Sequence, residues 1–223
     1  MNLQDVRLAT PHLAAQRQFF HEGLGLPILA ETTQECCIKI GISTLTWRQS
    51  SAPLAAPYHF ACNIPENQLI AGLVWLQQRS HVLEKDGHAI FDIEDWHAQS
   101  SYFRDADGNI LEIIARHDMA NGTDVPFGSQ SLLNISEVGL PSSDALALAT
   151  AIETTLGIVP WQEKHVRFTT MGDEAGLFIL VPNGRHWFPT DQPALPLPVV
   201  VTIATGTKGI LHLPDLPYHL YTQ

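Results

Sequence analysis

A carboxylate lies in the middle of an apolar segment, where its charge needs a partner. Residues 104–109 read Arg-Asp-Ala-Asp-Gly-Asn, a composition typical of a tight turn, and strand-forming residues flank it. Residues 110–115 are therefore expected to be the second strand of a hairpin. Because side chains alternate across a strand, Glu112 shares a face with Ile110 and Ile114. Glu112 forms a salt bridge, lies where the strand end reaches water, or serves as a metal ligand or catalytic base.

The composition indicates a globular chain with an acidic balance. Its 223 residues are 45% hydrophobic and 16% charged, enough for one large domain or two small ones. The formal net charge of −11 disfavours nucleic acid and anionic membranes as partners and favours a small ligand or a protein. No apolar run reaches the ~18 residues of a membrane span, and the start lacks a signal peptide, so we expect a cytoplasmic protein. Three cysteines in apolar stretches fit reduced core thiols.

A repeat with a spacing of 132 residues organises the chain. A strand pattern starts at Asp5 and is followed by helical spacing over residues 13–24. The same succession starts again at Glu137, with helical spacing over residues 145–156. A glycine closes each helix at the same spacing, which supports two related copies.

Two further units of similar plan complete the organisation. Residues 58–64 predict a strand and residues 67–79 a helix, with later strands that end in the segment containing Glu112. A fourth unit begins with the β-branched run 199–203, but the remaining chain is too short to complete it. We therefore expect residues 1–120 to form a complete domain of two modules and residues 130–223 a degenerate second copy with a truncated last module.

These segments resemble the vicinal oxygen chelate superfamily, which includes glyoxalase I, extradiol dioxygenases and bleomycin-binding proteins. The resemblance rests on three motifs in order: Gly23-Leu24-Gly25-Leu26, Tyr58-His59-Phe60-Ala61, and Tyr102-Phe103-x-Asp105-x-Asp107-Gly108-Asn109-x-Leu111-Glu112. It covers most of residues 1–116, and the second half matches more weakly. The resemblance implies an α+β fold of two tandem domains, in which paired βαβββ modules form curled mixed sheets, with helices outside and the ligand and any metal in the cup.

The resemblance also implies metal ligands on the first strand of each paired module and on the last strand of the second. Those positions hold Asp5, His59 and Glu112. Alternation places His59 with Asn63 on the small, polar face of its strand, as expected in a ligand cup. Such a set would suit a divalent ion such as Fe, Mn, Mg or Zn and leave positions open for substrate oxygens. Asp5 could instead pair with Arg7, which shares its face.

Further residues could line the cup. His97 precedes the strand that contains Tyr102, so His97 could act as acid or base and Tyr102 could donate a hydrogen bond. A loop histidine is also commonly only solvated. Trp47 and Tyr58 could stack on a planar ligand, although Trp47 also suits the core. The ligand-lining candidates are Arg7, Trp47, Tyr58 and Asn63.

The second half lacks a complete ligand set. Glu137 matches Asp5, but residues 198–204 contain no histidine and no second Gly-Asn-x-Leu-Glu segment follows. The cluster Arg185-His186-Trp187-Phe188 could fold over a neighbouring surface, and it has a structural role, as is common for aromatic side chains, or a ligand role. We therefore expect any metal site in the first half alone.

Two functions remain open. The first is a divalent-metal enzyme of the glyoxalase/dioxygenase type, a dioxygenase, lyase or isomerase acting on a small oxygen-bearing substrate. The second is a metal-free protein that binds a small molecule or an antibiotic. Metal analysis separates the two, and either could be a homodimer.

Overall fold

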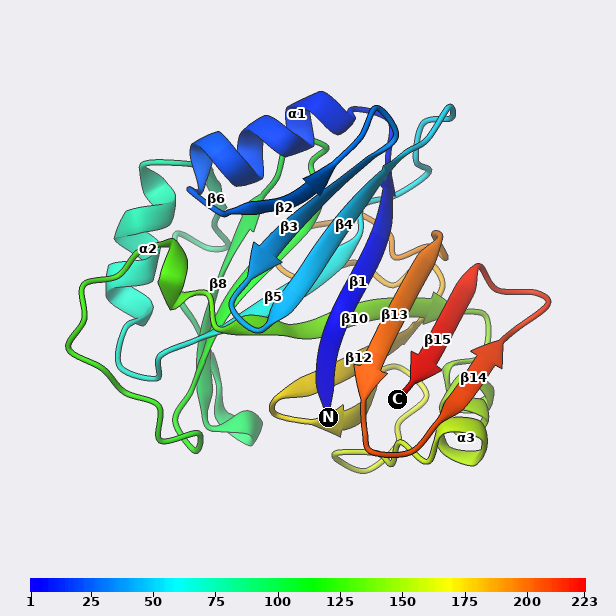
Figure 1. Ribbon diagram of the computed structural model, residues 1–223. Helices are drawn as coiled ribbons and strands as arrows, with labels where there is room; N and C mark the ends of the chain where they lie inside the picture. The colour runs from blue at the N-terminus through cyan, green and yellow to red at the C-terminus, as the bar shows by residue number, and fades with distance from the viewer.

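Two mixed β-sheets with the same succession of parallel and antiparallel neighbours form the framework (Figure 1). The computed structural model describes residues 1–223. In spatial order, the seven-stranded sheet contains β14 (Gly209–His212), β15 (Tyr218–Thr222), β13 (Val199–Ala204), β1 (Asn2–Thr10), β4 (Ser43–Gln49), β3 (Glu35–Ile40) and β2 (Ile28–Glu31). The eight-stranded sheet contains β11 (Thr169–Asp173), β12 (Gly176–Pro182), β10 (Asn134–Ser142), β5 (His59–Ile64), β9 (Ile110–Arg116), β8 (Ala98–Arg104) and β6 (His81–Leu83), with β7 (Phe91–Ile93) also paired to β8. The predicted α+β class with mixed sheets is confirmed.

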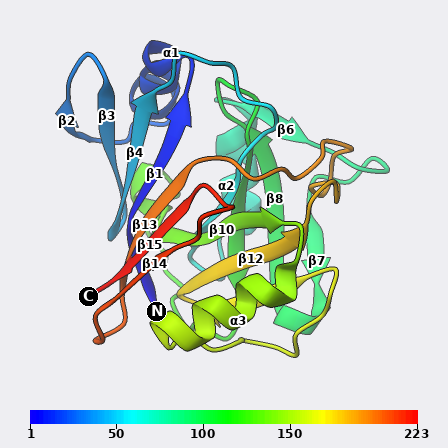
Figure 2. The ribbon, with the colours of Figure 1, turned by 90° about the vertical axis from the view of Figure 1, so that its right-hand side faces the viewer.

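Few helices accompany the sheets, and they lie on the outside (Figures 1 and 2). They are α1 (Leu13–Arg17), which continues as the π-helix η1 (Gln18–Gly23), α2 (Leu69–Gln77), α3 (Ala145–Leu156), and the 3₁₀ turns η2 (Glu94–Trp96) and η3 (Ser129–Ser131). The predicted bounds of α3 are confirmed because both ends are capped: Asp144 accepts a hydrogen bond from the Ala147 amide, and Gly157 takes a φ of 68°. None of the helices is both long and apolar enough to cross a membrane.

The central strand pairs join the two halves of the chain. Strand β5 pairs antiparallel with β10, and β1 pairs antiparallel with β13. Each sheet therefore combines one module from the first half with one from the second, which corrects the expected self-contained domain over residues 1–120. The repeat identifies the modules, but their first strands have similar sequence patterns. The sequence therefore does not specify which two of these strands pair with each other.

The apolar side chains form two clusters on opposite faces of the eight-stranded sheet. The main core of 43 buried residues joins the inner faces of both sheets to the helices. A second cluster of 12 buried residues, including Ala61, Tyr102, Ile114 and Trp187, covers the other face. Because this other face is also covered, polar side chains that project from it are enclosed and not solvated.

The turn between β8 and β9 fixes the strand that contains Glu112. The buried carboxylate of Asp105 accepts hydrogen bonds from the backbone amides of Asp107 and Asn109, at 2.9 Å each, and from the Asn109 side chain at 2.7 Å. A fourth hydrogen bond, of 2.9 Å, comes from Gln16 on α1. Asp105 therefore holds the predicted hairpin turn together and anchors it to the helix of the first module.

We predict that Asp105→Ala lowers the free energy of unfolding by about 3–5 kcal/mol, because four buried donors lose their acceptor. Urea unfolding of both proteins measures the difference. Asp124→Ala removes an exposed carboxylate with no hydrogen bond and serves as the control. A loss for Asp105→Ala as small as that of the control would show that the turn does not depend on this side chain.

Candidate metal centre

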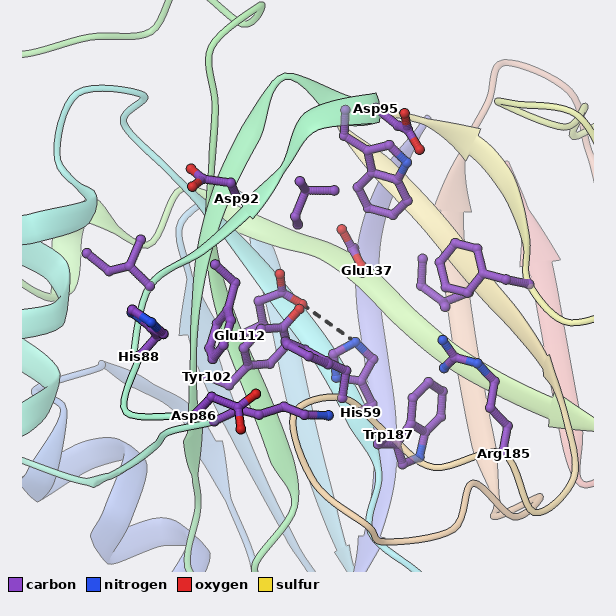
Figure 3. A pocket seen from close by; sticks show the side chains of 18 of the residues that line it. His59, Asp86, His88, Asp92, Asp95, Tyr102, Glu112, Glu137, Arg185 and Trp187 are labelled. Atoms are coloured by element: carbon purple, nitrogen blue, oxygen red, sulfur yellow. Dashed lines mark ion pairs between the residues drawn. The ribbon is translucent and has the colours of Figure 1, made fainter.

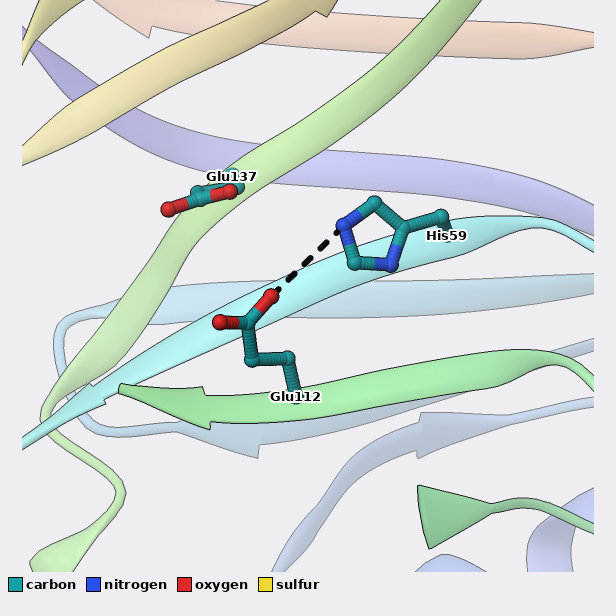
Figure 4. Close-up of side chains that lie close together, drawn as sticks. All are labelled: His59, Glu112 and Glu137. Carbon is teal, nitrogen blue, oxygen red and sulfur yellow. Dashed lines mark ion pairs between the residues drawn. The ribbon is translucent and has the colours of Figure 1, made fainter. Parts of the chain in front are cut away.

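Three potential ligands meet on the covered face of the eight-stranded sheet. His59 on β5, Glu112 on β9 and Glu137 on β10 present ligand atoms that all lie within 4.8 Å of one another (Figure 4). The Nε2 atom of His59 lies 3.7 Å from an Oε atom of Glu112. Ala61 on the central strand is in register with both glutamates, and its methyl group leaves room for the two carboxylates to approach. The group therefore depends on strand pairing between the halves.

The imidazole of His59 is neutral and oriented. Its Nδ1 atom lies 3.1 Å from the carbonyl oxygen of Ile110, which can only accept, so Nδ1 is the donor. Burial lowers the pKa of His59 to about 4. The contact with Glu112 is therefore not an ion pair at neutral pH, and the lone pair of Nε2 points at the carboxylates. This is the form in which histidine ligates a metal.

Arg116 provides a cation for one glutamate only. This fully buried side chain donates from Nη2 to Glu137 at 2.5 Å and from Nε to the Oδ1 atom of Asn63 at 3.1 Å. Its guanidinium lies over the rings of Trp96 and Trp161, at 5.2 and 5.5 Å from their centroids, and the two rings also contact each other. Burial raises the pKa of Glu137, and Arg116 opposes that shift. Glu137 thus has a fixed charged partner.

Glu112 has no side-chain cation bonded to it. Its carboxyl is 3% exposed, and burial together with the charge of Glu137 raises its pKa well above the ordinary value. The hydroxyls of Ser100 and Tyr102 oppose this shift in part, because they can donate to the carboxylate. The charge of Arg116 also favours the ionised form, but no cation is bonded to this carboxylate, so a bound metal ion would stabilise it.

A cavity of about 790 Å³ opens from these three residues (Figure 3). The aromatic side chains that line it are Phe91, Trp96, Tyr102, Phe168, Trp187 and Phe188. The Trp187 ring lies 4.8 Å from the His59 ring and packs against Gly139, where a Cβ atom would come within 2.6 Å of the indole. The charged side chains that line the cavity are Lys85, Asp86, Asp92, Asp95 and Arg185, in addition to the two glutamates. A volume of this size suits a small organic molecule.

The structure brings together three of the site residues expected from the sequence: His59, Glu112 and Tyr102. Asp5 is not among them, because β1 belongs to the other sheet. Its carboxylate instead accepts a 2.6 Å hydrogen bond from Arg7 and lies 3.3 Å from the hydroxyl of Thr46. The expected triad with Asp5 is therefore corrected, and Arg7, the partner of Asp5, also lies outside this cavity.

The other candidates do not line the cavity. His97 is exposed, takes a left-handed backbone at the end of η2, and pairs with Asp118 at 2.8 Å, while the preceding Trp96 takes the inward direction. Trp47 is fully buried in the main core, and the hydroxyl of Tyr58 donates to the Pro198 carbonyl at 2.8 Å. Asn63 lies behind the site, where it supports Arg116.

Two important residues come from the second half of the chain. Glu137 lies at the repeat position that matches Asp5, so the repeat in the sequence indicates it. The sequence does not indicate that its strand pairs with the module that contains His59 and Glu112. Trp187, Arg185 and Phe188 lie on the segment after β12 and line the cavity, with the Trp187 ring beside His59. The ion pair between Arg116 and Glu137 has no short-range sequence signal, because it joins different modules.

Comparison with solved structures identifies the architecture. A candidate dioxygenase from Bacillus subtilis superposes with a TM-score of 0.63 at 14% identity, covering 100% of this chain and 85% of that chain. A variant of glyoxalase I from Zea mays gives a TM-score of 0.62 at 15% identity, with 99% and 93% covered. The chain has the vicinal oxygen chelate fold. Comparisons with protein-family models and with curated proteins gave no match.

The resemblance inferred from the motifs is thus confirmed at the level of the vicinal oxygen chelate fold. Both solved structures match nearly the whole chain, so the four modules together correspond to one complete arrangement. At 14% and 15% identity the likeness concerns the fold, and the chemistry has to be argued from the side chains described above.

We predict that His59 in this fold titrates near pH 4 when metal is removed by a chelator, because burial disfavours its charged form. Its folded pKa lies below the unfolded value of 6.5, so its contribution to stability is lost as pH falls from 6.5 towards 4, by about 3 kcal/mol at most. Nuclear magnetic resonance of the imidazole measures the midpoint, and His59→Gln assigns the signal. A midpoint near 6.5 would contradict the buried, neutral form.

Proposed function

We propose that the chain is a divalent-metal enzyme of the glyoxalase/dioxygenase type that acts on a small oxygen-bearing molecule. The ligands are His59, Glu112 and Glu137. The supporting observation is the convergence of their ligand atoms within 4.8 Å at the closed end of the cavity, with Glu112 buried and without a bonded cation.

The donor set fits a divalent ion. Two carboxylates and one neutral imidazole suit Fe, Mn or Zn, and Mg less well because it prefers oxygen ligands. The position on β12 that corresponds in register to Glu112 on β9 is Ile179, which supplies no ligand. Three protein ligands leave coordination positions open towards the cavity, as in catalytic sites.

Charge balance supports the same proposal. With both glutamates ionised, as metal ligands would be, they and Arg116 carry one net negative charge on the covered face of the sheet, and the half-buried Arg185 adds a positive charge in the cavity. A divalent ion would stabilise the ionised form of Glu112, whereas in the alternative function, a metal-free binding protein, burial favours the protonated form of Glu112. The aromatic cavity fits either function, so the discrimination depends on Glu112.

A bound ion would act as a Lewis acid on substrate oxygen atoms. The residues of the chain then have distinct roles. Burial keeps the hydroxyl of Tyr102 protonated, because it raises the pKa of the phenol well above its usual value, so Tyr102 can donate a hydrogen bond to a substrate oxygen. Trp187 and Phe91 exclude water and hold a planar group. His59 moves no proton, since Nδ1 is committed to the Ile110 carbonyl.

We predict that the purified chain takes up one divalent ion, and that Glu112→Gln weakens Mn²⁺ binding by at least about 100-fold, because a charged ligand is lost. Isothermal titration calorimetry and elemental analysis measure this. Asp5→Asn is the matched control and should bind as the wild type does, since Asp5 lies in the other sheet. Failure of the wild type to bind Fe, Mn, Zn or Mg would favour the metal-free alternative.

Stability separates the loss of a ligand from a loss of folding. Without metal, Glu112→Gln should be at least as stable as the wild type, because the amide replaces a buried carboxyl whose ionised form burial disfavours. Glu137→Gln should be less stable by about 3 kcal/mol or more, because it leaves Arg116 buried without its partner. Thermal unfolding of the chelator-treated variants measures both changes, and equal effects of the two substitutions would argue against the unequal pairing.

Metal binding should release a proton. The pKa of Glu112 is well above the ordinary value, so the metal competes with a proton at a higher pH than for an exposed glutamate. We therefore predict that the affinity for Mn²⁺ keeps rising with pH above the range in which an exposed glutamate titrates. Titrations in buffers of different ionisation enthalpy count the released protons, and an affinity independent of pH would contradict this assignment.

A further inference from the structure

Arg185 is a half-buried cation in the cavity that forms no salt bridge. Its guanidinium lies over the Phe168 ring at 5.3 Å, and its side chain makes one long hydrogen bond, of 3.4 Å, to the neighbouring carbonyl of His186. The five donors of a guanidinium are thus almost all free towards the cavity. Arg116, by comparison, is paired with a carboxylate.

The surroundings of Arg185 do not compensate its charge. The pKa of Arg185 is lowered by burial and by the positive charge of Arg167, and only the phenolate form of Tyr102 would oppose this shift. Arg185 in turn disfavours the protonated form of His59, so its charge acts on the floor of the same cavity. Figure 3 shows Arg185 beside Trp187, on the same side of the cavity as His59.

We propose that Arg185 binds a carboxylate of the ligand, and that the ligand is therefore a planar aromatic or unsaturated monocarboxylate. This inference rests on the proposed function and names the substrate class of that same site. The fork of the guanidinium matches a carboxylate through two parallel hydrogen bonds. The aromatic side chains on both sides of the cavity, Phe91 and Trp187 among them, suit the flat faces of a ring.

Charge favours a monocarboxylate over a phosphate. Three exposed aspartates, Asp86, Asp92 and Asp95, line the cavity, and the other free cation among the lining residues is Lys85, which lies over Phe188 at 5.1 Å. A phosphate dianion would face this acidic opening with one guanidinium and the exposed ammonium of Lys85 to offset its charge. With a divalent ion bound, the enclosed charges sum to two positive. One carboxylate and one deprotonated substrate oxygen would balance them.

The test uses the full-length chain and two probes of the same shape, benzoate and benzamide, titrated with and without Mn²⁺ and followed by calorimetry. Neither probe offers vicinal oxygens, so the titration without metal reports on Arg185 independently of the metal site. We expect benzoate to bind about tenfold more tightly than benzamide, as a charged hydrogen-bonded pair does. Arg185→Gln should remove that difference and leave benzamide binding unchanged.

Arg167→Gln is the matched control, because Arg167 is the exposed cation next to Arg185 and does not line the cavity. It should change benzoate binding by less than about threefold. Arg185→Lys keeps the charge without the fork and should give an intermediate affinity. Circular dichroism verifies that each variant is folded.

Four outcomes would overturn the proposal: equal binding of benzoate and benzamide by the wild type, equal losses for both probes in Arg185→Gln, loss of benzoate binding in Arg167→Gln, or tighter binding of phenyl phosphate than of benzoate. The second would show that Arg185 only packs against Phe168. If the chain prefers benzoate but takes up no Mn²⁺, the proposed metal is refuted and the role of Arg185 is retained. If the chain takes up Mn²⁺ but does not prefer benzoate, the role of Arg185 alone is refuted.

Discussion

The antiparallel pairing of β5 with β10 is the contact on which the site depends. It places the first strand of the second module beside the first strand of the third, and so brings His59 and Glu137 to one surface. The parallel neighbour β9 then adds Glu112 on the other side of β5. Only a small residue at position 61 allows both carboxylates to lean over the same strand. Sheet topology, more than any single motif, creates the group of three ligands.

Enclosing two carboxylates under aromatic side chains imposes a charge constraint on the rest of the site. Arg116 offsets the charge of one of the two carboxylates. Its own charge is stabilised by Glu137, by Asn63 and by two tryptophan rings. No cation is bonded to Glu112, and the charge of Arg116 and the nearby hydroxyls of Ser100 and Tyr102 favour its ionised form only in part. Structural ion pairs seldom leave such a remainder, because an uncompensated buried charge costs several kcal/mol. This asymmetry distinguishes a ligand site from a buried salt-bridge network.

The sequence predicted the elements and two of the three residues of the candidate metal centre, since these depend on local signals. Turn residues around Asp105 identified the hairpin, alternation placed Glu112 and His59 on inward faces, and the caps at Asp144 and Gly157 defined α3. The third ligand was missed because it depends on which modules pair. Strand edges of similar composition are interchangeable at the level of periodicity, and the choice is made by tertiary contacts such as Ser43, whose hydroxyl bonds both Leu3 and Ile135. Packing between residues far apart in the sequence, such as that of Trp187 against His59, likewise produces no local sequence pattern.

The two sheets show why the same strand arrangement yields a site only once. In the seven-stranded sheet, Asp5 and Thr46 hold the register positions of His59 and Glu112. That face is open: Arg7 and Arg48 on it are exposed, with side chains 44% and 59% accessible. Asp5 can therefore satisfy its charge with Arg7 and water. In the eight-stranded sheet, side chains from residues 85–96 and 185–188 enclose the cavity over the corresponding face, so its carboxylates have no such contact with water. A carboxylate at this strand position needs a bound cation only where the face of the sheet is enclosed.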